Sequence, residues 1–373
     1  MRDLDLRMYA SAFGRIHGAF TMDAALLFFA YAALSDAIRG AVVEIGVHHG
    51  LSAIALAALR AQKAPMIAID TFGASGDATA SGGMSTDLGT FGRNMSQAYG
   101  DVEWLRVIEA DSRTLSAADL ATQPPVSFFH IDGGHSVEET YHDLSLATAV
   151  SIRGGLVALD DYFNPSFPGV SEGTVKYLLD HPGALVPLAI GANKVIFRRG
   201  DAGDLNARFV ERYPFIPRTR AVFAGGEVLV FGSGVAKYVD VARSTTTSLV
   251  ARDLVLRVDL KPHVSALIAS PGMAVPLTVT VRNRSNVPLE WSDSPFGLSY
   301  HVLRGDGGVE RYENARAWFI PPLAEGQERA MTLPVIAPER PGEYVVEVDI
   351  VWEGICWLRE RGNAPARIAL RAT

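Results

Sequence analysis

Short apolar runs followed by an acidic or polar residue recur through the first half of the chain. Residues 128–131 and 156–159 are the clearest runs, and an aspartate follows each of them. An apolar run of this length between glycine and polar residues is typical of a strand buried in a parallel sheet. Residues 41–45, 66–70 and 104–108 repeat the pattern, so we expect them to join the same sheet.

A helical pattern connects the two clearest runs. Val137, Tyr141, Leu144 and Thr148 recur near helical spacing within residues 136–153. A strand, a crossover helix and a second parallel strand form a right-handed unit that can place the two strands side by side. We therefore expect an α/β fold, a Rossmann-like, doubly wound, seven-stranded sheet.

The pattern changes near residue 200. A predicted hairpin at 184–198 closes the sheet, so residues 1–200 are expected to form one domain. Residues 201–247 are predicted to connect it, through a short helix and a small hairpin, to residues 248–373. This last part shows short strands between proline and glycine turns, as in an immunoglobulin-like β-sandwich. Its predicted strands are 254–260, 277–282, 297–304, 330–336, 344–352 and 368–371.

Residues 1–40 are predicted to be helical, with Thr21 as an N-cap. The apolar stretch 24–34 is bracketed by Asp23 and Asp36 and is too short to cross a bilayer. We therefore expect a buried or lid-forming helix and no transmembrane segment.

Composition narrows the class of protein. The 373 residues are 48% hydrophobic and 20% charged, as in ordinary globular proteins. A net charge of −7 argues against a general nucleic-acid binder, which needs a basic face. Cys356 is the only cysteine, so the chain has no intrachain disulfide and no cysteine-rich metal site. We expect a cytoplasmic protein that forms a homo-oligomer.

Three acids mark the ends of the two clearest runs. Asp132, Asp160 and Asp161 are expected to meet at the carboxyl edge of the sheet, where open α/β folds bind ligands. Carboxylates that converge repel one another unless a cation neutralises them. The structural alternatives are a helix N-cap for Asp132 and a turn for the pair. Residues 71–92, rich in Gly, Ser, Thr and Ala, predict a long loop beside this edge.

The first turn, residues 44–50, has glycine where a strand must bend sharply and let a ligand approach the backbone. It lacks both the G-x-G-x-x-G spacing of a dinucleotide loop and the G-K-[ST] of a phosphate loop. Asp70 and Asp111, near the ends of the next two strands, are placed for a ribose diol and an adenine amino group. A cationic ligand with a neutral sugar is favoured over a polyphosphate.

These segments resemble class I S-adenosylmethionine-dependent methyltransferases. The E-x-G-x-x-x-G turn, Asp70 and residues 109–112 carry the likeness, while D-G-G-H at 132–135 and the pair at 160–161 narrow it. Over residues 14–199 the chain is similar to macrocin O-methyltransferase-like enzymes, which methylate sugar hydroxyls with a divalent metal. The resemblance implies S-adenosylmethionine and Mg²⁺, or another divalent cation, as cofactors. The implied cofactor contacts are Glu44, Gly46, Val47, Gly50, Asp70, Thr71, Asp111, Ser112 and Asp132.

The resemblance also implies metal ligands at Asp132, Asp160 and Asp161, with His135 as the base that takes the hydroxyl proton and Asp132 beside it. A histidine at the start of a helix also serves as a cap. His130, inside a strand, is expected to be a packed core residue.

His48 and His49 lie in the predicted cofactor turn, and one of them is expected to line the pocket. His142 and Asp143, on the crossover helix, are expected to face solvent.

The C-terminal part shows no catalytic constellation. Its large aromatic residues are expected to be mostly core, with stacking on sugar rings as the alternative. They are Trp291, Tyr300, Trp318, Phe319, Trp352 and Trp357. The part is similar to β-sandwich domains on bacterial glycan-modifying enzymes, which favours an interaction or glycan-binding module.

The sequence thus predicts a metal-dependent O-methyltransferase whose acceptor is a sugar-containing molecule: a glycan, glycolipid or glycosylated metabolite. One alternative is a methyltransferase acting on a phenol or amine of a small molecule. Another is an inactive glycan-binding or scaffold protein. Binding of S-adenosylhomocysteine separates the enzymes from the scaffold.

Overall fold

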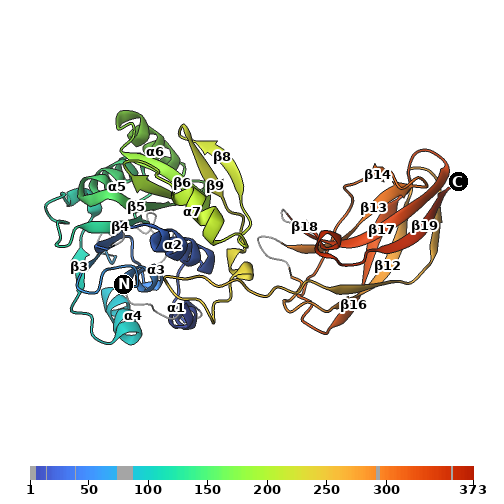
Figure 1. Cartoon of the computed structure of the whole chain (residues 1–373), viewed down its shortest axis with the longest axis horizontal. Coiled ribbons are helices and arrows are strands. Elements are labelled where there is room, and N and C mark those ends of the chain that lie inside the picture. The colour runs from blue at the N-terminus through green and yellow to red at the C-terminus, as the bar shows by residue number, and fades with distance from the viewer. Residues whose placement is uncertain (1–5, 14, 38, 74–86, 291–294, 354–355) are drawn as a thin grey trace. The chain divides into compact units, whose positions relative to one another are not determined.

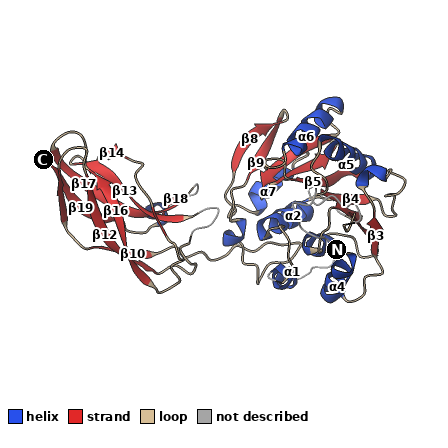
Figure 2. Cartoon of the chain, turned by 180° about the vertical axis from the view of Figure 1, so that it is seen from behind, coloured by secondary structure: helices blue, strands red, loops and turns tan. Residues whose placement is uncertain are grey.

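The computed structural model describes residues 6–13, 15–37, 39–73, 87–290, 295–353 and 356–373. The chain forms two compact units, Met1–Arg252 and Asp253–Thr373. Helices and strands alternate in the N-terminal unit, whereas strands dominate the C-terminal unit (Figures 1 and 2). Among the described residues, no helix is both long enough and apolar enough to span a membrane.

The N-terminal unit is built on a nine-stranded sheet of order β3-β2-β1-β4-β5-β7-β6-β9-β8. Strands β1 to β5 are parallel to one another, and β7 lies antiparallel to β5. The strands are β1 Ala41–Ile45, β2 Met66–Asp70, β3 Leu105–Glu109, β4 Val126–Ile131, β5 Ser151–Asp160, β6 Leu185–Gly191, β7 Lys194–Arg199, β8 Thr219–Phe223 and β9 Gly226–Val230. The expected α/β fold with a large, mainly parallel sheet is confirmed.

Two of the nine strands come from the segment expected to be a connection. The predicted small hairpin forms as β8 and β9, but β9 pairs in parallel with β6 and so extends the main sheet. The seven-strand expectation is wrong for this reason, and the N-terminal unit runs to Arg252 instead of ending near residue 200.

Apolar side chains cover both faces of this sheet. In Figure 1, α5 and α6 lie on one side of the strands and α2 and α3 on the other. Along β1, Val42 packs into one core, while Ala41 and Val43 pack into the second. The helices are α1 Leu6–Phe13, α2 Met22–Leu34, α3 Leu51–Ala57, α4 Leu88–Tyr99, α5 Val137–Val150, α6 Pro168–Asp180 and α7 Leu205–Arg212. The doubly wound arrangement buries both faces, as parallel strands require.

The start of α4 falls within the loop expected at residues 71–92. Asp87 caps the helix by accepting hydrogen bonds from the backbone N–H groups of Gly89 and Thr90. Phe91 is fully buried in the core, so tertiary packing outweighs the two glycines of this turn. Residues 74–86 of the expected loop lie outside the described part of the chain.

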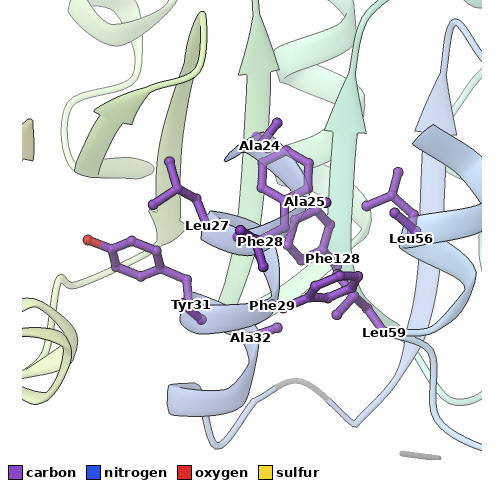
Figure 3. Close-up of a cluster of buried hydrophobic side chains, with 14 of the residues drawn as sticks. Ala24, Ala25, Leu27, Phe28, Phe29, Tyr31, Ala32, Leu56, Leu59 and Phe128 are labelled. Atoms are coloured by element: carbon purple, nitrogen blue, oxygen red, sulfur yellow. The ribbon is translucent and has the colours of Figure 1, made fainter. Parts of the chain in front are cut away.

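Helix α2 is a core helix rather than a lid. Thr21 caps it as expected, accepting from the N–H of Ala24 at 3.2 Å. Its sequence is apolar on every side, and a helix of this kind is stable only when surrounded by protein. Figure 3 shows Phe28 and Phe29 among side chains of the sheet and of α3. The short stretch before α2 lies closer to the sheet edge, because the ring of Phe20 is 5.9 Å from that of His130.

The described residues of the C-terminal unit form two sheets and no α-helix. One sheet has the order β10-β12-β16; the other has the order β11-β19-β17-β13-β14, with β15 and β18 paired at its side. All strand pairs are antiparallel except β11 with β19. The strands are β10 Val258–Pro262, β11 Ala266–Ala269, β12 Ala274–Asn283, β13 Phe296–Arg304, β14 Val309–Arg311, β15 Ala317–Trp318, β16 Glu328–Ile336, β17 Gly342–Trp352, β18 Cys356–Trp357 and β19 Ala366–Ala372. The immunoglobulin-like assignment stays a prediction.

Most of the large aromatic residues of this unit are core residues. Tyr300, Phe319, Trp352 and Trp357 are buried, and Trp318 is half-buried. These side chains hold the sheets together, so the aromatic content of the unit gives little support to sugar stacking. Trp291 lies outside the described residues.

Phe28→Ala should destabilise the N-terminal unit by about 3–5 kcal/mol, the usual cost of removing a buried phenylalanine. The ring is 1% exposed and lies 5.1 Å from that of Phe128. The measurement is urea denaturation of the full chain. Leu179→Ala is the control, because Leu179 is 74% exposed and its loss should change the free energy of unfolding by less than about 0.5 kcal/mol. Equal effects of the two substitutions would contradict the core position of α2.

Candidate active site

The carboxyl ends of β1, β2, β4 and β5 meet at one edge of the sheet. In the register of β4 and β5, Ile131 pairs with Leu159, so Asp132 and Asp160 follow side by side. Their carboxylates and the imidazole of His130 each offer one atom within 4.8 Å of the others. The structure thus brings together two of the three predicted acids and a histidine expected only to fill the core.

The turn after β1 packs directly on the backbone that follows β4. Gly46 has a φ of +84°, and a Cβ placed on it would lie 1.7 Å from the carbonyl oxygen of Asp132. The N–H of Gly46 donates to Ile69, and the N–H of Asp132 donates to Ile45, both at 2.8 Å. Glycine is required here by both conformation and space.

Asp70 joins the first two turns. Its carboxylate accepts from the backbone N–H of His48 and from that of Phe72, both at 2.9 Å. Both bonds hold the turn backbone against the end of β2 and leave lone pairs of the carboxylate available to a ligand. A ribose diol in this position would find an acceptor that is already fixed in place.

The other predicted cofactor contacts near these turns differ in burial, backbone conformation and bonding. Val47 is buried, and Gly50 adopts a φ of +92° where α3 begins. Thr71 is half-buried, and Ser112 is buried. Asp111 is bound by the guanidinium of Arg113 at 2.6 Å, which holds the pKa of the Asp111 carboxyl below its usual range. The role of each as a cofactor contact stays a prediction.

Glu44 and His130 form a pair that is inaccessible to solvent. Glu44 Oε1 lies 2.9 Å from His130 Nδ1. Burial raises the pKa of Glu44 to about 8, while burial and the nearby Lys194 hold the pKa of His130 well below its ordinary value. Both groups therefore favour their neutral forms, as expected where water is excluded.

Lys194 is the residue of this site that sequence reasoning missed. It begins β7 and pairs in register with Asp160 of β5, and its ammonium group contacts the Asp160 carboxylate. Lys194 is 3% exposed. Burial would lower its pKa, but Asp160 and Asp132 outweigh burial and raise it. The one local signal was a lysine directly before the short apolar run 195–197.

Asp161 is directed toward His135 and two amide side chains. Its carboxylate accepts from Asn164 at 2.8 Å and from Asn193 at 2.6 Å, and it lies 3.2 Å from His135 Nε2. Burial would raise the pKa of Asp161, but the bonds from His135, Asn164 and Asn193 hold it at about 2. His135 also stacks on Phe167, with ring centroids 3.7 Å apart. The imidazole is thus fixed in position beside an ionised carboxylate.

Asp143 corrects another expectation. It was predicted to face solvent from the crossover helix but is fully buried, because the helix turns this side chain under the D-G-G-H segment. A Cβ on Gly133 would lie 3.4 Å from Asp143 Oδ2. Burial raises the pKa of Asp143 to about 7.

His48 and His49 lie side by side in the first turn, with ring centroids 3.9 Å apart. His17, from the segment before α2, adds a third imidazole whose centroid is 6.0 Å from that of His48. His48 and His49 are half-exposed and His17 is exposed, so this group of three imidazoles comes from two segments of the chain and is open to solvent.

The side chains as arranged do not fit a magnesium ion. Mg²⁺ requires oxygen ligands in near-octahedral geometry. Asp160 Oδ1 accepts from the N–H of Asp161 and from Asn193, and Oδ2 from Lys194. The carboxylate oxygens of Asp161 are also engaged, and the third nearby group is the imidazole of His130. The expectation of a metal at Asp132, Asp160 and Asp161 stays a prediction.

Gly46→Ala should lower the free energy of unfolding by about 1–3 kcal/mol more than Gly183→Ala, the usual cost of forcing an added group into a packed site. Both glycines have positive φ, so both substitutions carry a conformational cost of roughly 1–2 kcal/mol. At Gly183 a Cβ would meet no atom within 4 Å, whereas at Gly46 it would overlap the Asp132 carbonyl. Urea denaturation measures both variants, and equal losses would show that the turn is not packed as described.

The stability of the protein should fall between pH 6.5 and 8, and less so in Glu44→Gln. The folded-state pKa of Glu44, about 8, lies above its ordinary value of 4.5. As the pH rises between these values, the unfolded chain releases this proton and the folded protein keeps it, which lowers the free energy of unfolding. His130, whose folded-state pKa is lowered, acts in the opposite direction only below about pH 6.5. Identical pH slopes in both proteins would rule out a protonated Glu44.

Comparison with known protein families gives a match within the N-terminal unit. Residues 43–162 match the family model described as a methyltransferase domain. No curated protein matches the chain. Among solved structures, the O-methyltransferase NovP is 18% identical over 48% of this chain and 81% of its own, with a TM-score of 0.38. CalS11, titled a TDP-rhamnose 3'-O-methyltransferase of calicheamicin biosynthesis, is 20% identical over 49% and 82%, also at 0.38. TomG from Streptomyces achromogenes is 16% identical over 54% and 92%, at 0.37.

The matched residues run from β1 to just beyond β5. They include the Gly46 turn, Asp70 and the acids at 132, 160 and 161, and they end before Lys194. The expectation of an enzyme that transfers methyl groups is confirmed at this level: the N-terminal unit contains a methyltransferase domain.

Proposed function

We propose that the N-terminal unit is an S-adenosylmethionine-dependent O-methyltransferase that acts on a sugar hydroxyl. The observation that carries the proposal is the contact between the Gly46 turn and Asp132. This contact holds the turn that we assign to the cofactor next to an edge that includes His135 and Asp161. Among the alternatives, an inactive scaffold would have no need for both features to be intact.

The turn is suited to the methyl donor. It provides a close backbone approach at Gly46 and a preorganised acceptor at Asp70. Neither feature supplies the lysine and clustered N–H groups that a polyphosphate requires. S-adenosylmethionine, when bound, supplies a methyl group on a positively charged sulfur. The acids of the edge favour such a positive charge.

His135 and Asp161 are suited to activating a hydroxyl. When His135 Nε2 donates to the ionised Asp161 carboxylate, the lone pair resides on Nδ1, which is then the basic nitrogen. During transfer, the bond from carbon to sulfur breaks as the bond from carbon to the acceptor oxygen forms, and Nδ1 takes the hydroxyl proton. Stacking on Phe167 fixes the plane of the ring, and orientation of this kind contributes substantially to displacement reactions.

The class of acceptor is inferred from two sequence motifs. The sugar hydroxyl follows from the resemblance of the D-G-G-H and D-D segments to sugar O-methyltransferases. A phenol or amine acceptor is the second enzyme hypothesis. An assay of S-adenosylhomocysteine release with methyl glycosides, nucleotide-activated sugars, phenols and amines separates the two. Turnover with phenols or amines alone would overturn the sugar assignment.

The cofactor assignment is tested by calorimetry with S-adenosylhomocysteine. Saturable binding with one site per chain is the expected result. Absence of binding would overturn the proposed function and support the scaffold hypothesis.

His135→Gln should lower kcat by about 10²–10⁴-fold, the usual contribution of a general base. Cofactor affinity should stay within about threefold, because the imidazole acts on the acceptor and not on the donor turn. His263→Gln is the matched control, since this histidine lies in the C-terminal unit and should leave kcat unchanged. A loss of affinity for S-adenosylhomocysteine without a change in kcat would instead make His135 a binding residue.

A further inference from the structure

A buried ammonium group occupies the acidic edge of the sheet. Lys194 stands opposite Asp160 in the pairing of β5 with β7, and its Nζ contacts the Asp160 carboxylate. The same nitrogen lies 5.2 Å from the centroid of the Phe20 ring. Lys194 is therefore held by a carboxylate on one strand and by an aromatic ring from the N-terminal segment, with almost no access to water.

The positive charge of Lys194 offsets the repulsion between the three acids. An ammonium group out of water is unfavourable unless it is paired. Here Asp160 is in contact, and Asp132 and Asp161 also attract it. The attraction is mutual, because the same positive charge neutralises carboxylates that would otherwise repel one another.

The hydrogen bonds around Asp160 and Asp161 leave little capacity for a further cation. Asn193 donates to both carboxylates, at 3.1 Å and 2.6 Å. A divalent ion at this edge would displace these donors and would lie beside the Lys194 ammonium, which repels it. Asp132 alone keeps oxygens that no described donor occupies.

We propose that the Lys194 ammonium is the resident cation of this edge and replaces the divalent metal that the three acids alone predict. The proposal rests on the proposed function, because it concerns the same site. Lys194 acts as a positioning residue, because it holds Asp160 in place and balances the charge around Asp132. The acceptor then binds at this edge without a metal ion.

Mn²⁺ binding to the full chain tests the proposal, with electron paramagnetic resonance as the readout. Wild-type protein, stripped with a chelator, should show no saturable Mn²⁺ binding at millimolar concentration. Stoichiometric binding that is lost in Asp160→Asn would overturn the proposal. This measurement uses no Lys194 variant, so it tests the proposal even if such variants fail to fold.

Lys194→Ala should create a Mn²⁺ site. Removal of the repelling charge should tighten binding about tenfold or more, because close charges still interact strongly at an effective dielectric constant of about 20. The new site should disappear in Lys194→Ala/Asp160→Asn. Mn²⁺ should also raise the Tm of Lys194→Ala but not that of wild type. Lys261→Ala, at an exposed lysine of the C-terminal unit, is the matched control and should behave as wild type. Unchanged Mn²⁺ binding in a folded Lys194→Ala protein would refute the role of Lys194.

Calorimetry with S-adenosylhomocysteine on the same samples separates the two proposals. If the nucleoside binds and wild type also binds Mn²⁺ at this edge, the Lys194 assignment fails and the proposed function stands. If the nucleoside does not bind, the proposed function fails whatever the Mn²⁺ result.

Discussion

The site depends on one close contact, the packing of the Gly46 turn on the backbone of Asp132. Hydrogen bonds from Gly46 to Ile69 and from Asp132 to Ile45 tie the ends of β1, β2 and β4 together. Because no side chain fits between Gly46 and the Asp132 carbonyl, the distance between the Gly46 turn and the acidic edge is fixed by backbone geometry. The side chains of the turn and those of the acidic edge therefore keep fixed relative positions.

Exclusion of water determines how the charged groups at this edge behave. Glu44 and His130, deep in the sheet, avoid the cost of burial by favouring neutral forms. Asp160 and Lys194, one step closer to the edge, are paired across two strands. The same physical constraint thus produces a neutral pair and an ion pair within a few residues of each other.

Local sequence patterns predicted the parts of the fold that local patterns control. The runs that became β1, β2 and β4 ended where expected, with Asp70 closing β2 and Asp132 directly after β4. Pairings between distant segments could not be predicted in this way. The parallel pairing of β9 with β6 added two strands to the sheet, and burial of Phe91 converted part of a glycine-rich loop into α4.

The role of Lys194 likewise could not be predicted from local sequence patterns. The motif that suggested a metal ends near residue 162, and so does the match to the methyltransferase domain. The cation that contacts Asp160 comes from the neighbouring strand β7, more than thirty positions along the chain. Acids at a strand end specify that a positive charge is needed there. Whether a metal ion or a side chain supplies it is decided by the residue that the sheet register places opposite.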